Sequence, residues 1–85
     1  MALYAIIAPL DNAKIGPAIE SVFEGNFVRV WNGQWFVSCP PTTPKEICEK
    51  LGIADGSNGS GIVLVIASYW GRGNPDLWPW MATRM

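Results

Sequence analysis

The sequence contains no histidine, and this limits the chemistry that its side chains can support. Without an imidazole there is no Ser-His or Cys-His nucleophile, no histidine metal ligand and no side chain that ordinarily titrates near neutral pH. Asp11, which follows the first apolar segment, is the one candidate for metal-dependent hydrolysis. Such hydrolysis usually needs several carboxylates converging on the ion. We therefore expect no catalytic residue, no bound metal and no cofactor, with Asp11 as the residue to test.

Two further groups of residues look at first like sites. Cys39 and Cys48 are too few and too close for a disulfide framework or a four-ligand zinc site, so we expect two buried thiols. The loop Asp55–Gly61 is rich in glycine and serine, but Ile66 stands where a calcium loop has its twelfth-position glutamate. The loop also lacks the Gly-Lys-Ser/Thr of a phosphate loop. It is typical of a flexible connector.

The elements that would position these residues begin with two apolar runs. Leu3–Ala8 and Gly61–Ser68 are apolar at nearly every position, which predicts strands covered on both faces. Apolar residues at helical spacing predict a helix from residue 15 to 23, with Pro17 as its first full helical residue and Gly25 as its end. The capping box Thr43-Pro44-Lys45-Glu46 predicts a second helix, which Gly52 ends.

Between the two helices lies a predicted hairpin. Asn32-Gly33 is typical of a two-residue type I′ turn, and apolar segments flank it on both sides. That turn predicts a register from Trp31 opposite Gln34 and Val30 opposite Trp35 to Phe27 opposite Ser38. One face of the hairpin would then carry Val28, Val30, Trp35, Val37 and Cys39, and the other Phe27, Arg29, Trp31, Gln34, Phe36 and Ser38. We expect the face with Phe27, Trp31 and Phe36 to be the one that the helices leave uncovered; the reverse assignment stays open, because neither face is polar.

The order of elements predicts the fold. After the last strand, Asn74-Pro75-Asp76 has the signals of a helix start and precedes a short segment with Leu77, Trp78, Trp80 and Met81. Strand, helix, strand, strand, helix, strand is the ferredoxin-like βαββαβ order of an α+β domain. We expect residues 1–85 to form one domain: a four-stranded antiparallel sheet, two helices on one face and a short C-terminal helix.

Such a sheet would leave one face uncovered by the two main helices. The exposed aromatic rings of the hairpin would forgo several kcal/mol at about 25 cal/mol per Å² of buried surface. Three covers are possible: a second copy of the chain, which we favour, the C-terminal segment folded back, or a ligand or nucleic-acid strand. The last strand would lie at a sheet edge, where an all-apolar run needs a partner or a cover. The expected dimer or partner surface comprises Phe27, Arg29, Trp31, Phe36, Arg72, Trp78 and Trp80.

Composition and charge narrow the class of protein. With 49% hydrophobic and 15% charged residues, the chain is too apolar for intrinsic disorder. The net charge of −1 provides no cationic field for a phosphate backbone, which argues against nucleic acid as a partner. No Lys or Arg precedes the apolar stretch Ala2–Leu10, so it is read as a strand and not as a leader. We expect a cytoplasmic protein that does not enter the membrane.

The pattern resembles a family of small bacterial proteins labelled SinR-like, related to the CRISPR-associated adaptation endoribonucleases. The matching segments are Tyr4-Ala5-Ile6-Ile7, Trp35-Phe36-Val37, Pro44-Lys45-Glu46-Ile47, Leu51, Ile62–Ile66, Trp70 and Trp78-Pro79-Trp80-Met81. The resemblance implies a ferredoxin-like fold and a homodimer formed through the sheets. In the nuclease relatives it also implies metal-dependent cleavage by an aspartate at the end of the first strand. Here Pro9 stands at that position, and Asp11 follows two residues later.

The leading hypothesis is a small, non-catalytic, homodimeric interaction module. The family resemblance adds a role as an accessory protein of a mobile element or toxin-antitoxin locus. The first alternative is a divergent metal-dependent endonuclease that uses Asp11. The second is an RNA-binding module in which Trp31 and Phe36 stack on bases across an open sheet.

Overall fold

The computed structural model describes residues 1–84. Its elements are β1 (Ala2–Ile7), α1 (Ile15–Val22), β2 (Phe27–Trp31), β3 (Gln34–Cys39), α2 (Pro44–Leu51), β4 (Ile62–Ile66) and α3 (Leu77–Ala82). The strands form one antiparallel sheet in the order β2-β3-β1-β4, which is the predicted ferredoxin-like α+β arrangement. No helix within residues 1–84 is long and apolar enough to cross a bilayer.

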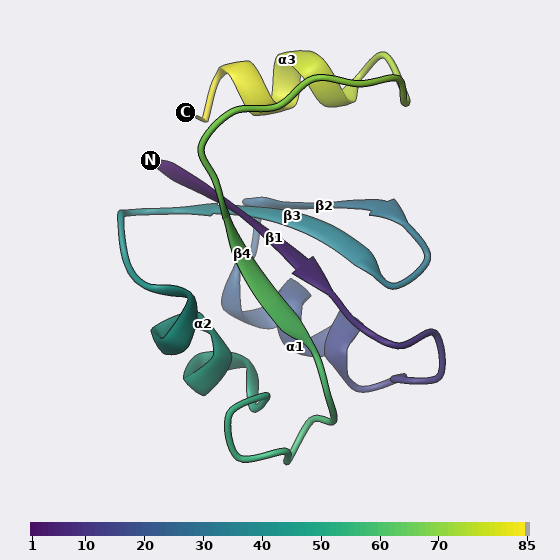
Figure 1. The fold of residues 1–85 in the computed structure, drawn as a ribbon, viewed down its shortest axis with the longest axis vertical. Coiled ribbons are helices and arrows are strands. Elements are labelled where there is room, and N and C mark those ends of the chain that lie inside the picture. The colour runs from purple at the N-terminus through teal and green to yellow at the C-terminus, as the bar shows by residue number, and fades with distance from the viewer. Residues whose placement is uncertain (85) are drawn as a thin grey trace.

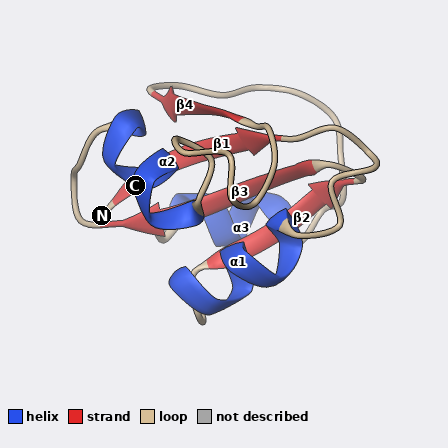
Figure 2. Ribbon diagram, turned by 90° about the horizontal axis from the view of Figure 1, so that it is seen from below, coloured by secondary structure: helices blue, strands red, loops and turns tan. Residues whose placement is uncertain are grey.

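The molecule has three layers. Helices α1 and α2 cover one face of the sheet, and α3 lies against the other (Figure 1). Viewed from below, α1 and α2 lie in front of the strands and β4 forms one edge of the sheet (Figure 2). The central strand β1 therefore has protein on both sides, which is why it is apolar on both faces.

Two hydrophobic clusters separate the layers. The helix-side cluster is the larger and consists of Tyr4, Ile6, Ala8, Ile15, Ile19, Phe23, Trp35, Val37, Ile47, Leu51 and Val63. The α3-side cluster has Leu3, Leu77 and Met81 at its centre, with Val28, Val30, Phe36, Ile66, Tyr69, Trp78 and Trp80 packed around them. The C-terminal segment thus covers much of the face that the two main helices leave open.

The hairpin register differs from the prediction. The pair Trp31–Gln34 is present, but beyond it Arg29 lies opposite Trp35, Val28 opposite Phe36 and Phe27 opposite Val37, with an irregularity between Arg29 and Trp31. A type I′ turn needs a positive φ at both turn residues, whereas Gly33 has φ +76° and Asn32 does not have a positive φ. A single left-handed glycine is the pattern of a longer loop closed by a bulge, in which one strand gains a residue.

The bulge changes which face the β2 side chains occupy. Phe27, predicted to lie on the uncovered face, packs against the helix-side cluster. Val28 and Val30, predicted to lie with Trp35, instead pack on the α3 side. The predicted faces of β3 are correct: Trp35 and Val37 point to the helices, and Phe36 points to α3.

Local signals explain where the two main helices begin and end. The Thr43 hydroxyl accepts a hydrogen bond from the Glu46 backbone N–H (3.2 Å), and Gly52 closes α2 with φ 75°. The Glu46 carboxylate is hydrogen-bonded by the Thr42 hydroxyl, so only half of the predicted capping box is present. Helix α1 begins at Ile15, so Pro17 is its third residue and not its first.

Candidate interaction surface

The predicted partner-surface residues do not form one surface. Phe36, Trp78 and Trp80 pack together in the α3-side cluster of a single protomer. Phe27 lies on the opposite face of the sheet. Arg29 is exposed at the β2 edge, and its guanidinium donates to the Asn32 side chain within the turn. The face expected to be bare is thus largely filled by the C-terminal segment, as in the second of the three covers considered.

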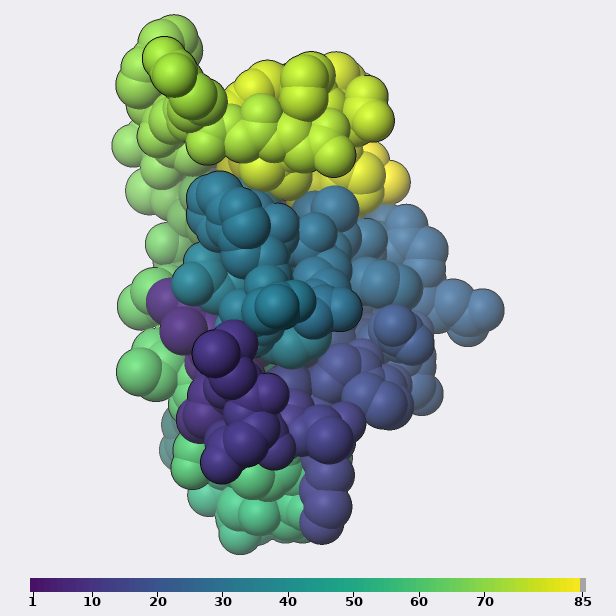
Figure 3. Space-filling model, turned by 90° about the vertical axis from the view of Figure 1, so that its right-hand side faces the viewer, coloured from purple at the N-terminus to yellow at the C-terminus, as the bar shows by residue number. Residues whose placement is uncertain are grey.

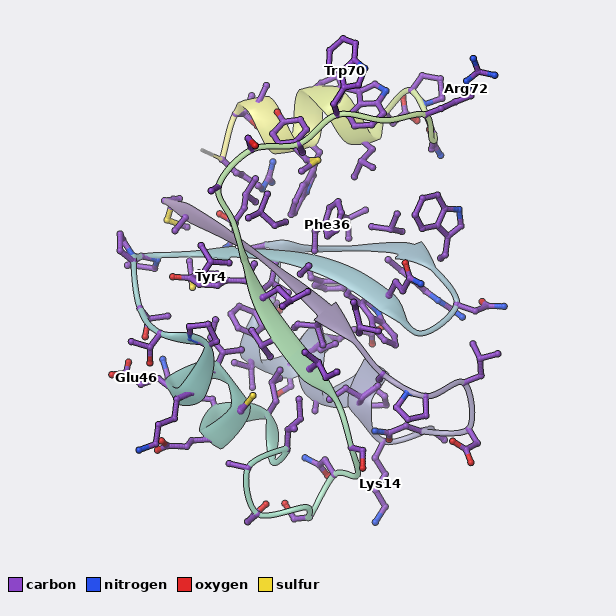
Figure 4. The ribbon with its side chains drawn as sticks, viewed as in Figure 1. Tyr4, Lys14, Phe36, Glu46, Trp70 and Arg72 are labelled. Carbon is purple, nitrogen blue, oxygen red and sulfur yellow. The ribbon has the colours of Figure 1, made fainter. Side chains whose placement is uncertain are left out.

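Two apolar hollows remain around α3. One, of about 240 Å³, is lined by Tyr69, Trp70, Gly71 and Trp78, and the other, of about 190 Å³, is a groove between the hairpin and the segment that follows β4. Trp31, which is 59% exposed, lines one side, and Trp70, Arg72 and Trp78 line the other. Figure 4 shows Trp70 and Arg72 above α3, on the chain that crosses it, and Phe36 between the sheet and α3. In the space-filling view, this C-terminal region sits over the hairpin (Figure 3).

A run of exposed apolar side chains follows β4. Ile62 is 60% exposed, Leu64 47% and Val65 57%, and Ile7 of the neighbouring strand is 40% exposed. Ile62 pairs with Ile7 and Leu64 with Ala5, so these side chains share the α3 side of the sheet with Leu3 and Ile66. Val65 pairs with Tyr4 and therefore faces the helix side. The strand therefore exposes apolar side chains on both of its faces. We call this strand, Ile62–Ile66, the β4 edge.

A hollow of about 350 Å³ lies where β4 begins. Ile7, Ala8, Pro9, Ser60, Gly61 and Ile62 line it. Apart from the Ser60 hydroxyl, the side chains that line it are apolar. Ile7 and Ile62 are on the α3 side of the sheet and remain exposed, whereas Ala8 belongs to the helix-side cluster. The hollow therefore lies at the end of the β1–β4 pair, with its exposed wall on the α3 side.

The two edges of the sheet differ in charge. Residues 56–71, which include β4 and its flanks, contain no charged side chain. At the other edge, β2 carries the exposed Arg29 and the bulge. Charges and bulges on edge strands oppose pairing with another chain, and β4 has neither. The sequence had indicated that the last strand would be a vulnerable edge, but not which of its residues stay exposed.

The catalytic candidate Asp11 is exposed in the loop after β1. It lines an open hollow of about 430 Å³ together with Asn12, Lys14, Gly56 and Gly59. Within residues 1–84, no group of three or more Cys, Asp or Glu side chains converges as a metal site would require. Asn12 accepts from the Lys14 N–H (3.1 Å) and donates to the Ser60 carbonyl (2.9 Å), so it links the two loops that border this hollow.

Cys39 and Cys48 are free thiols and half-buried, rather than buried as predicted. Burial raises the pKa of the Cys39 thiol, although the positive charges of Lys50 and the N-terminus partly oppose this effect. A raised pKa reduces the thiolate fraction and with it the reactivity of Cys39.

The glycine-rich loop is tied down by its own polar groups. The Asp55 carboxylate accepts from the Ser57 backbone N–H (2.9 Å) and hydroxyl (2.8 Å), which lowers the pKa of Asp55. The Asn58 amide donates to the Leu51 carbonyl at the end of α2 (2.8 Å). The polar side chains of Asp55, Ser57 and Asn58 therefore form hydrogen bonds within the protein.

Comparisons with protein-family models, with curated proteins and with solved structures found no match for this chain.

Proposed function

We propose that the protein is a non-catalytic interaction module that acts as a homodimer, and that two copies associate through the β4 edge. The observation that carries the proposal is an uncharged edge strand whose Ile62, Leu64 and Val65 are all about half exposed or more. Exposed edge strands of this kind pair readily with another strand, and monomeric proteins usually protect them.

Exposure on both faces of β4 favours edge-to-edge pairing over stacking of the sheets. A second copy stacked on the α3 side would cover Ile62 and Leu64 but leave Val65 in water. A second β4 strand laid alongside would extend the sheet and bury part of all three side chains. It would also supply partners for the outward-facing backbone N–H and C=O groups of β4.

The dimer differs in one respect from that expected from the sequence. The expected surface was the aromatic sheet face, and that face holds the α3-side cluster. A dimer through the β4 edge leaves this cluster intact. The accessory role in a mobile element or toxin-antitoxin locus, which the family resemblance implies, stays a prediction.

Sedimentation velocity tests the proposal. At micromolar concentrations the wild-type chain is expected to sediment as a dimer. Leu64 is the middle residue of β4, so in a symmetric pair Leu64→Lys would place two ammonium groups side by side, and this variant is expected to sediment as a monomer.

Val22→Lys is the matched control. Val22 is also an exposed aliphatic residue (41%), but it lies on α1. This variant gains the same charge and should remain dimeric. Circular dichroism is used to check that both variants are folded. A monomeric wild-type chain, or a Leu64→Lys variant as dimeric as the wild type, would contradict the proposal.

A further inference from the structure

We infer that, in this dimer, Trp70 of each protomer occupies the hollow at the start of β4 in the other protomer. The inference rests on the proposed homodimer and adds to it a reciprocal exchange of two tryptophan rings. Three independent features of the structure lead to it: the exposure of Trp70, the apolar lining of the hollow, and the positions of both relative to β4.

The Trp70 side chain is fully exposed, at 100%. Its neighbours are not: the adjacent Tyr69 stacks on Trp78 with ring centroids 6.2 Å apart, and both pack in the α3-side cluster. Tryptophan is the side chain with the largest apolar surface to bury, and it is enriched at the centres of protein interfaces. A fully solvated indole beside two packed aromatic rings indicates a group that is buried by something outside the protomer.

The hollow is suited to an apolar ring. The hollow has a volume of about 350 Å³ and opens to solvent, so a ring can enter it from another chain. Ile7, Pro9 and Ile62 supply apolar walls, and Ser60 also lines the hollow. Ile7 and Ile62 are both substantially exposed, so the hollow has surface still to bury.

The geometry of β4 connects the ring to the hollow. Within one protomer they lie at opposite ends of the strand: the hollow precedes Ile62, and Trp70 follows Ile66. Antiparallel pairing about the central Leu64 sets Ile62 beside the partner's Ile66, so each hollow meets the end of the strand from which the other Trp70 departs. The four residues from Ile66 to Trp70 can span up to about 13 Å.

The exposed wall of the hollow is on the same side of the sheet as Trp70. Ile7 and Ile62 face the α3 side, and the segment that carries Trp70 is the one that crosses over α3 (Figure 4). Since residues 56–71 carry no charge, two copies approach through this region without like-charge repulsion. The same lack of charge provides nothing to attract a phosphate backbone or a charged peptide, which makes a second copy the occupant that fits.

Two measurements test the inference. The first is the dimer dissociation constant by sedimentation equilibrium. Trp70→Ala is expected to raise this constant by roughly tenfold or more, as for a tryptophan that is buried in an interface. Trp31→Ala is the matched control, because Trp31 is also an exposed tryptophan but lies on β2, at the other edge of the sheet. This control should leave the constant unchanged.

The second measurement is cross-linking between two variants, each with Cys39 and Cys48 replaced by serine. A Trp70→Cys chain mixed with a Ser60→Cys chain is expected to give a covalent dimer with a short bis-maleimide. A Trp70→Cys chain mixed with a Ser21→Cys chain should not, because Ser21 lies on α1. Each chain carries a single cysteine, so a covalent dimer joins two protomers, and its mass shows whether it contains both variants.

The outcomes separate this inference from the proposal on which it rests. If the wild-type chain is dimeric but Trp70→Ala binds as tightly and no Trp70–Ser60 cross-link forms, the ring exchange is wrong and the homodimer stands. If the wild-type chain is monomeric, both are wrong. The exchange is supported if Trp70→Ala weakens the dimer, Trp31→Ala does not, and the Trp70–Ser60 cross-link forms.

Discussion

Single residues fix the local geometry of this small domain, and Gly33 is the clearest case. Its φ of +76° is in the left-handed region, and its carbonyl accepts a hydrogen bond from the Ala8 N–H (2.8 Å), which ties the hairpin turn to the end of β1. A Cβ atom on Gly33 would lie 2.5 Å from the Ala8 carbonyl oxygen. The turn therefore has both a conformational and a steric need for glycine.

Gly33→Ala is expected to destabilise the fold more than Gly25→Ala. Gly25 has a similar φ of +77°, but nothing lies within 4 Å of its added Cβ, so its substitution costs only the left-handed strain of about 1–2 kcal/mol. Gly33→Ala adds a backbone clash and should lose at least twice as much. Urea unfolding at one protein concentration measures both. Equal losses would mean that the contact between the turn and β1 does not matter.

The turn at Gly33 also shows why the hairpin register could not be predicted from the sequence. Asn32-Gly33 predicted a turn at the right place, but the dipeptide is compatible both with a two-residue loop and with a longer loop closed by a bulge. The choice between them decides the face of every residue of β2 beyond the turn. Neither face of β2 is polar, so the register shows only in tertiary contacts, such as the packing of Phe27 against the helix-side cluster and of Val28 and Val30 on the α3 side. The turn sequence carries no information about these long-range contacts.

At the scale of elements, α3 determines how much of the second face of the sheet remains exposed. The order of strands and helices followed from apolar periodicity, capping residues and glycines, and it was predicted correctly. The sequence does not distinguish between the three possible covers of the open face, because a second copy, a ligand or the chain's own C-terminal segment could each bury its apolar side chains. In the structure, Leu77 and Met81 fill that face against Leu3. Once α3 covers this part of the sheet, the exposed apolar residues that remain on this side are Trp31, Ile7 and residues of β4.

Met81→Ala is expected to destabilise the protein by about 2–5 kcal/mol, the usual cost of emptying a fully buried position. Met81 is 0% exposed and lies at the centre of the α3-side cluster. Leu10→Ala is the control, since Leu10 is 81% exposed and should change stability by less than about 0.5 kcal/mol. Chemical denaturation of both variants gives the difference. A loss as small as that of Leu10→Ala would show that α3 does not stay docked on the sheet.

For the whole molecule, the decisive feature is the contrast between the two edges of one sheet. The β2 edge has a charge and a bulge, the devices that keep edge strands from pairing, while the β4 edge has an uninterrupted apolar strand within an uncharged stretch of chain. The helices and the C-terminal segment lie over the two faces of the sheet, and β4 is an edge strand with no neighbour on its outer side within the sheet (Figure 2). The asymmetry makes association through one edge, in closed pairs, the expected outcome rather than open-ended growth.

Amide hydrogen exchange distinguishes this arrangement from any dimer formed through a sheet face. The β4 amides that point away from β1 are expected to exchange slowly when the protein is concentrated and fast when it is diluted below the dimer dissociation constant, because the partner strand supplies their acceptors. The outward-pointing amides of β2 should exchange fast at both concentrations. In Leu64→Lys, the β4 amides should exchange fast throughout. Protection of β4 that does not depend on concentration, or protection that appears equally at β2, would rule out pairing through the β4 edge.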